Sequence, residues 1–238
     1  FLDTMEGQNL SLQVHPLTEY IKKNFGMSYT QDESYYILDA KEDAHVYLGL
    51  KEGIDKEEMI RDLESAQRKE IVFDADKYIN KFTAKKHDHF LIPAGTCHCS
   101  GKNAMVLEIS ATPYIFTFKL WDWQRLGLDG LPRPINIEHG KHVIQWDRTT
   151  EWVKEHLVNS IYEVKEEKND CKIEHTGLHE LEFIETRRYT VKDNSFHKTN
   201  GTVNMLNLID GKSAIIEGDF EPFIVHYAET FIIPASIK

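Results

Sequence analysis

Residues 10–16, LSLQVHP, decide how this chain is interpreted. The segment has the apolar alternation of a strand, and it places Gln13 and His15 two positions apart. Side chains at positions i and i+2 of a β-strand project from the same face of a sheet. The segment therefore predicts a strand that presents an amide and an imidazole together, and the question is what these two side chains hold.

The composition is that of a globular chain with an acidic balance. Of 238 residues, 41% are hydrophobic, and 39 acidic residues outnumber 28 basic ones, which gives a formal net charge of −11. No basic tract resembles the positively charged surface with which proteins bind nucleic acids. We therefore expect no nucleic-acid partner, and a site for an anionic substrate would need locally clustered Lys or Arg.

Cysteine content and hydropathy bear on where the protein works. Three cysteines are too few for a disulfide framework, which favours a reducing compartment. No apolar run approaches the length of a membrane span, and no signal-peptide pattern is visible. We expect a cytoplasmic protein without a membrane partner, whose oligomeric state the sequence does not indicate. The chain opens at Phe1 inside a patterned segment, so we expect that upstream sequence is missing.

Short segments rich in Val, Ile, Phe and Tyr recur in the first half, bounded by Gly, Asp, Asn or Pro. They cover residues 34–38, 45–50, 89–93 and 104–110. Such a pattern is typical of an all-β sandwich or barrel. Helical patterning is confined to 55–68, 74–82 and 147–159, and the first two of these segments open with an Asp suited to capping. The sequence predicts an all-β fold with helical insertions.

A weak internal repeat suggests two related halves. HFLIPAG at 89–95 is echoed by TFIIPAS at 230–236, and strand patterning resumes at Leu181. We expect a metal-binding first domain over 1–140 with a helical insertion near 55–80, and a linking helix over 141–163. A second, truncated β domain is expected over 164–238.

An acidic residue stands on the inward face of a predicted strand. In DESYYIL, at 32–38, Glu33 shares that face with Tyr35 and Ile37. A buried carboxylate without a partner is costly and tends to become protonated. A metal ion would supply the partner.

IPAGTCHCS, at 92–100, adds a histidine after a Pro-Ala-Gly turn. Two imidazoles, one carboxylate and one amide oxygen suit Zn²⁺ with water in the open positions, and Mn²⁺, Fe²⁺ or Co²⁺ would also fit. A single carboxylate leaves a divalent ion with a net charge of about +1, so that it remains a useful Lewis acid. The predicted ligands are Gln13, His15, Glu33 and His98.

Other histidines and the cysteines have simpler interpretations. A lone histidine is more often a surface or core residue than a ligand, and His87 and His89 in HDH read as a solvated turn. Cys97 and Cys99 flank His98 and point to the other face of their strand, where we expect them to be small core residues.

Six motifs in order carry a resemblance to a known family. Together they resemble the type I mannose-6-phosphate isomerases, which are zinc-dependent double-cupin enzymes, and the resemblance is strong over residues 10–137. The motifs are LSLQVHP (10–16), DESYYILDA (32–40), YLGL (47–50), FLIPAGTCH (90–98), MVLEIS (105–110) and LWDWQRLGLDGLPRPINI (120–137).

The resemblance implies two jelly-roll barrels and the interconversion of mannose 6-phosphate and fructose 6-phosphate. In that family the metal is held by the Gln and His of Q-V-H-P, by a Glu in the next strand and by the His that ends P-x-G-T-x-H. These positions match Gln13, His15, Glu33 and His98. We therefore expect a metal-dependent aldose–ketose isomerase with a hexose phosphate as its partner.

The resemblance also implies catalytic and substrate-binding residues. Catalysis would involve Glu108, Lys119 and Arg125, with Glu108 as the base that moves the proton. Substrate binding would involve Ser11, Lys119 and Arg125. Two simpler interpretations stay open. In one, Glu108 is paired with a lysine on the barrel wall; in the other, the role of Asp122 and Arg125 is only that of a structural ion pair.

Departures from the family pattern motivate two alternatives. Gln31 stands where the family usually has Lys, Ile115 stands at an aspartate position, and Lys119 replaces an arginine. Lys keeps the charge of Arg but loses the bidentate fork. One alternative is a catalytically impaired cupin that binds hexose phosphates as a sensor or regulatory module. The other is a cupin of different chemistry, such as an iron-dependent oxygenase.

Overall fold

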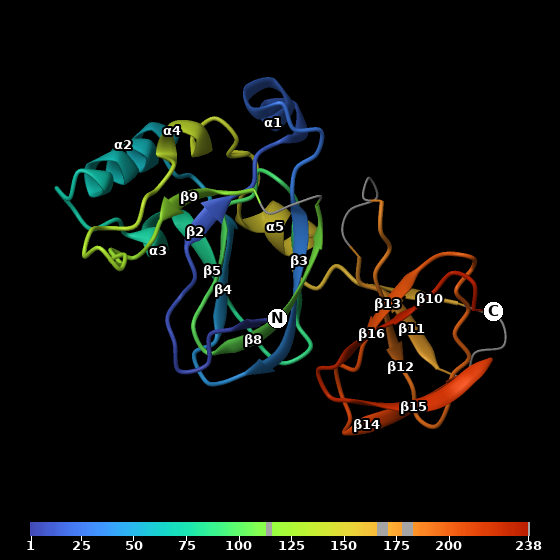
Figure 1. The fold of residues 1–238 in the computed structure, drawn as a ribbon. Coiled ribbons are helices and arrows are strands. Elements are labelled where there is room, and N and C mark those ends of the chain that lie inside the picture. The colour runs from blue at the N-terminus through green and yellow to red at the C-terminus, as the bar shows by residue number, and fades with distance from the viewer. Residues whose placement is uncertain (113–115, 166–170, 178–182, 238) are drawn as a thin grey trace. The chain divides into compact units, whose positions relative to one another are not determined.

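The structure, a computed structural model, describes residues 1–112, 116–165, 171–177 and 183–237. Short strands make up most of its regular structure, with few helices (Figure 1). The chain divides into two compact units. The first comprises Phe1–Glu163 with Glu174–Arg188, and the second comprises Val164–Ile173 with Tyr189–Lys238.

Two antiparallel sheets form the first unit. The four-stranded sheet has the order β1 (Leu2–Asp3), β8 (Ala104–Ala111), β3 (Asp32–Ala40) and β6 (His89–Ile92). The five-stranded sheet has the order β5 (Ile79–Thr83), β4 (His45–Leu50), β7 (His98–Ser100), β2 (Leu12–Val14) and β9 (Phe118–Trp121). The four strands expected at 34–38, 45–50, 89–93 and 104–110 are confirmed, as is the mainly β class of the fold.

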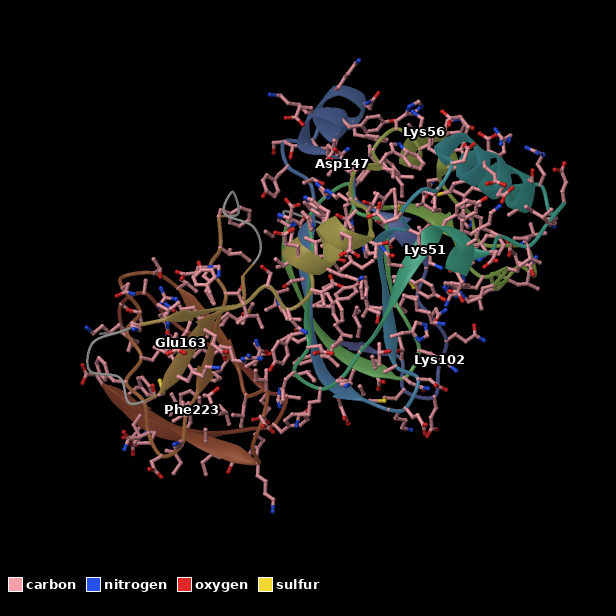
Figure 2. The ribbon with its side chains drawn as sticks, turned by 180° about the vertical axis from the view of Figure 1, so that it is seen from behind. Lys51, Lys56, Lys102, Asp147, Glu163 and Phe223 are labelled. Atoms are coloured by element: carbon pink, nitrogen blue, oxygen red, sulfur yellow. The ribbon has the colours of Figure 1, made fainter. Side chains whose placement is uncertain are left out.

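The two sheets pack against each other through apolar side chains. Tyr35 and Ile37 of β3 share one cluster with Val46 and Leu48 of β4, and all four are almost fully buried. Burying such a side chain stabilises the fold by about 1.5–3 kcal/mol. Side chains fill the space between the sheets (Figure 2). Within the described residues the two sheets share no strand pairing, so a closed barrel stays a prediction.

Helix α2 (Lys56–Gln67) covers the outer face of the five-stranded sheet. Met59, Leu63 and Ala66 form its buried stripe, at the i, i+4, i+7 spacing of an amphipathic helix, and pack in one cluster with Leu12. The helix begins where sequence predicts, because the Asp55 carboxylate accepts a hydrogen bond from the N–H of Glu58 at 2.9 Å.

The other helices differ from expectation. The prediction of a helix over 74–82 is wrong beyond its first turn. The helix α3 (Ala75–Tyr78) ends there, and the chain continues as β5, which pairs with β4. That pairing buries Ile79 opposite Leu50, and tertiary packing overrides a weak helical pattern. The expected third helix is present as α5 (Thr150–His156), shorter at both ends, while α1 (Thr18–Phe25) and α4 (Ile137–Gly140) were not anticipated.

The chain after α5 forms small sheets. One has the order β10 (Tyr162–Val164), β11 (Lys172–His175) and β12 (Arg187–Thr190). Two antiparallel pairs join β13 (Asn204–Asn207) to β16 (Thr230–Ile233), and β14 (Ser213–Gly218) to β15 (Phe220–His226). Both copies of the weak internal repeat, at 89–95 and 230–236, form a strand that ends just before the proline. These strands are β6 and β16. Leu181 lies outside the described residues.

None of the helices that the structure describes has the length and apolarity needed to cross a membrane.

Candidate metal centre

The side chains singled out by the strand pattern come from both sheets. Gln13 on β2 is in direct register with His98, the first residue of β7, and His15 follows β2 by one position. Glu33 lies on β3 of the other sheet. The ligand atoms of His15, Glu33 and His98 all lie within 4.8 Å of one another, and the three residues are buried. The sheets therefore face each other across this cluster.

The distances between these atoms suit a shared ion. Nε2 of His98 lies 2.9 Å from Oε1 of Glu33, and Nε2 of His15 lies 3.3 Å from Oε2 of the same carboxylate. Two ligands of one tetrahedral zinc ion, each about 2.1 Å from it, are roughly 3.4 Å apart. Gln13 Nε2 lies 3.2 Å from His98 Nε2. A half-turn of the Gln13 amide would bring its oxygen to that position.

Backbone carbonyls fix the tautomer of both imidazoles. Nδ1 of His15 donates to the carbonyl of Phe116, and Nδ1 of His98 donates to the carbonyl of Thr96, each at 2.9 Å. A carbonyl only accepts, so each Nδ1 carries the proton of the neutral ring. The lone pair of each Nε2 is then directed to the cluster, which is how metal-binding histidines are held.

Two atoms of the cluster lack a hydrogen-bond partner. His15 Nε2 and Glu33 Oε1 are among the eight buried side-chain atoms of the described residues that have no aligned donor or acceptor. Leaving a buried polar atom unsatisfied costs about 1–3 kcal/mol. A cation at the centre would satisfy both atoms at once, so the donor set fits a metal ion.

The charges of the cluster also favour a bound cation. Burial opposes ionisation of Glu33, but His15 and His98 outweigh it and hold the pKa of Glu33 below its usual value. Burial likewise opposes a proton on the His15 ring, yet the Glu33 carboxylate raises the pKa of His15 above its usual value. The carboxylate thus demands a positive charge beside it, which a bound cation would supply in place of a proton.

The turn before His98 is held by buried polar contacts. The Arg148 guanidinium donates to the carbonyls of Pro93 and Ala94 at 2.8 and 2.7 Å. Gly95 adopts a φ of +88°, where a Cβ atom would lie 2.6 Å from the side chain of Gln145. Only glycine fits this position without strain, so the Pro-Ala-Gly sequence sets the direction from which the chain enters β7.

Glu108 on β8 lies beside the cluster. Its carboxylate accepts a hydrogen bond from Ser110 Oγ at 2.8 Å, and the residue is in register with Tyr35 of β3. Burial, reinforced by the charge of Glu33, raises the pKa of Glu108 to about 7. The described residues include no lysine paired with Glu108, which speaks against the barrel-wall ion pair.

Lys119 on β9 is in register with Gln13, so the two side chains leave the same face of the sheet. The Lys119 side chain has no ion pair or hydrogen bond to any residue that the structure describes. An unpaired ammonium group on this face is available to an anionic ligand.

Asp122 and Arg125 form the ion pair that the sequence left open. Arg125 Nε donates to Asp122 Oδ1 at 3.1 Å, a second nitrogen of the guanidinium contacts the same oxygen, and Ser11 Oγ donates to it at 2.7 Å. Arg125 also donates to the carbonyl of Asn9 at 2.8 Å. The roles of Ser11 and Arg125 in substrate binding stay predictions.

The outcomes differ among the remaining residues that the sequence singled out. Cys97 and Cys99 are buried in the apolar core, as expected. The solvated turn predicted at HDH is wrong for His89, whose ring is buried and whose N–H donates to Asn159 Oδ1 at 2.8 Å. The segment after α5 covers this strand, and nothing near residue 89 in the sequence signals it. Ile115 lies outside the described residues.

Gln31 is a residue of this centre that the sequence noted only as a departure. It is 2% exposed, and its Nε2 donates to Glu33 Oε2 at 2.8 Å. The same i, i+2 rule that joins Gln13 to His15 would have placed it beside Glu33. The carbonyls of Phe116 and Thr96 carry no side-chain signal and were not foreseeable.

Comparison with known proteins agrees with the site. No model of a protein family matches the chain. A Bacillus subtilis protein named "Probable mannose-6-phosphate isomerase GmuF" is 32% identical over 138 residues, which are 58% of this chain and 41% of that protein. Mannose-6-phosphate isomerase ManA of Bacillus subtilis is 25% identical over 213 residues, 90% of this chain and 62% of that protein. The chain thus spans less than two thirds of the length of these relatives.

The fold is also similar to that of a solved structure. The crystal structure of the mannose 6-phosphate isomerase from Bacillus subtilis superposes with a TM-score of 0.71 at 19% identity, covering 97% of this chain and 67% of that one. Fold and site together define a mainly β protein with a candidate metal-binding centre. More particularly, the chain is similar in sequence and in fold to proteins named mannose-6-phosphate isomerase.

Proposed function

We propose that this protein is a metal-dependent isomerase that interconverts mannose 6-phosphate and fructose 6-phosphate. One observation carries the proposal: the buried ligand atoms of His15, Glu33 and His98 converge, with both imidazoles fixed for metal binding, in a chain whose relatives are named mannose-6-phosphate isomerases.

Gln13, His15, Glu33 and His98 would hold the ion, for which Zn²⁺ is our choice over Mn²⁺, Fe²⁺ and Co²⁺. When bound, such an ion acts as a Lewis acid that polarises a carbonyl or hydroxyl oxygen of the sugar. The neutral amide of Gln13 adds a ligand without adding negative charge, which preserves that acidity.

Glu108 is our candidate for the group that moves the proton. Aldose–ketose isomerisation transfers a proton between C2 and C1 of the open-chain sugar. A carboxyl group with a pKa of about 7 is partly ionised at neutral pH, so it can accept the proton and return it. Burial, the main cause of that raised pKa, therefore suits Glu108 to both steps.

Positive side chains would balance the charge of the substrate. Lys119 leaves the same face as Gln13 and has no described partner, so we assign it to the substrate, where it would offset negative charge on the sugar oxygens or the phosphate. Arg125 and Ser11 would assist substrate binding from their joint contact with Asp122. We propose a hexose phosphate as the ligand on this basis.

The second unit would correspond to the second of two cupin barrels, over about residues 164–238. Support comes from the strand echo, which recurs as β6 and β16, and from the superposition over 97% of the chain.

The decisive experiment measures metal content and turnover on the same preparation. We expect stoichiometric zinc and a coupled signal from mannose 6-phosphate that a chelator abolishes and zinc restores. Glu33→Ala should lose both, whereas Glu42→Ala, which removes an exposed carboxylate of the first unit, should lose neither. Stoichiometric zinc without turnover, together with thermal stabilisation by hexose phosphates, would replace the isomerase by the sensor; bound iron alone would favour an oxygenase.

A further inference from the structure

Gln31 joins the side chain of Glu33 to the backbone of Phe116 through hydrogen bonds. It immediately precedes β3, two positions before Glu33, and is almost fully buried. Its amide donates to the ligand side chain of Glu33 and, at 3.5 Å, to Ser110 Oγ, and it accepts from one backbone N–H.

The donor side of the amide fixes Glu33. Gln31 Nε2 donates to Glu33 Oε2 at 2.8 Å. That oxygen faces His15, and the other carboxylate oxygen faces His98 at 2.9 Å. The hydrogen bond therefore sets the rotation of the carboxylate, and with it which oxygen each imidazole meets.

The acceptor side of the amide reaches His15 through one peptide segment. Gln31 Oε1 accepts from the N–H of Phe116 at 3.2 Å, and the carbonyl of Phe116 accepts from His15 Nδ1 at 2.9 Å. Phe116 is anchored in turn by its ring, whose centroid lies 4.9 Å from the centroid of the Phe25 ring. The position of the His15 ring thus depends on a residue that Gln31 holds.

The bonds to Glu33 and Phe116 leave the amide a single orientation. Turning it by half a turn would face Nε2 toward an N–H and Oε1 toward a carboxylate, and both contacts would be repulsive. A side chain at position 31 that lacks either a donor or an acceptor cannot reproduce the arrangement.

We infer that Gln31 is a positioning residue that sets two predicted metal ligands at once, Glu33 directly and His15 through the backbone of Phe116; the inference rests on the proposed metal centre. Because the amide is neutral, it orients the carboxylate without neutralising it, and Glu33 keeps its full charge for the ion. Loss of such an outer partner typically weakens metal binding 10- to 100-fold.

The test uses Gln31→Met, which nearly preserves the volume of the side chain and removes its hydrogen bonds to Glu33, Ser110 and Phe116. Affinity for Zn²⁺ is measured by competition with a chromogenic chelator, and the visible spectrum of the Co²⁺-loaded protein reports the geometry of the ligands. We expect binding about 10- to 100-fold weaker than in the unmodified protein, with an altered Co²⁺ spectrum. Gln67→Met, on the exposed end of α2, is the matched control and should change neither.

A second variant separates the bonds to Glu33 and Phe116 and covers the case in which Gln31→Met does not fold. Gln31→Lys keeps a donor for Glu33 but offers no acceptor to the N–H of Phe116, and it adds a positive charge beside Glu33. Weaker affinity would report that charge, whereas an altered Co²⁺ spectrum is the change expected from the lost contact to Phe116, and through it to His15. Unchanged affinity and spectrum in the folded variants would overturn the inference while leaving the metal centre intact. Absence of zinc binding in the unmodified protein would instead remove the proposed function, and the inference with it.

Discussion

Nε2 of His98 lies 2.9 Å from Oε1 of Glu33, although the first residue belongs to the five-stranded sheet and the second to the four-stranded sheet. The contact joins the two layers of the first unit at a point where both side chains are buried. An ion held there would link the sheets directly.

Zinc should therefore stabilise the folded chain. A ligand that binds only the native state adds about 2.7 kcal/mol to the free energy of unfolding at a concentration 100 times its Kd. We expect the melting temperature to rise with added Zn²⁺ and to fall back on chelation. Glu33→Gln, which removes the carboxylate charge at constant shape, should abolish the rise, and Glu42→Gln should retain it. A melting temperature indifferent to zinc would count against the centre.

Glu108→Gln should separate catalysis from metal binding. The substitution keeps the shape of the side chain but removes the group assigned to proton transfer, which typically contributes a factor of about 10²–10⁴ in rate. We expect kcat to fall by that factor while zinc content stays unchanged. Steady-state kinetics and metal analysis on the same sample make the comparison. Retention of most of the activity would assign the proton transfer to another residue.

His89 should make the fold sensitive to acid. Burial, aided by the charges of Arg188 and His175, lowers the pKa of His89 to about 4, whereas the unfolded chain takes up the proton near pH 6.5. Between these values the unfolded state binds more protons, so stability is lost as the pH falls from about 6.5 toward 4. The linkage relation gives a loss of about 2 kcal/mol by pH 5.

Urea unfolding at pH 7 and pH 5 measures this loss. His89→Gln lacks the titrating ring, and its stability should fall by about 2 kcal/mol less than that of the unmodified protein between the two values. Equal losses in the two proteins would show that His89 does not carry the effect.

Two glycines with the same backbone conformation should respond differently to alanine. Gly49 in β4 and Gly53 have φ angles of +64° and +69°. A Cβ atom at Gly49 would lie 2.3 Å from Val153 Cγ2 and 2.9 Å from the Arg148 carbonyl, whereas a Cβ at Gly53 would meet nothing within 4 Å. Gly53→Ala should cost about 1 kcal/mol from backbone strain alone, and Gly49→Ala about 1–3 kcal/mol more from overpacking. Chemical denaturation of both variants measures the two losses in the free energy of unfolding. Equal losses would contradict the prediction.

Side-chain periodicity accounts for the part of the structure that the sequence could predict. The i, i+2 rule in LSLQVHP and DESYYIL put Gln13, His15 and Glu33 on inward faces. The ligand atoms of His15 and Glu33 do converge, together with those of His98. The rule works here because each of these strands has one buried face, so that register and orientation are tightly coupled.

Features that depend on distant segments escaped prediction. Residues 79–83 become a strand because β4 is available to pair with them, and His89 is buried because the chain near Asn159 covers it. The tautomers of His15 and His98 are set by carbonyl groups, which every residue possesses and no sequence pattern marks.

The side chains of Gln13 and His98 meet although 85 positions separate them along the chain. An unfolded polypeptide therefore brings only Gln13 and His15 close together, since the loop that must close before His98 joins them is long. We expect the ion to be captured after both sheets have paired, so that its uptake marks the completion of folding and does not nucleate it. Refolding rates should accordingly be the same with and without metal, and only the rate of unfolding should slow when the ion is present.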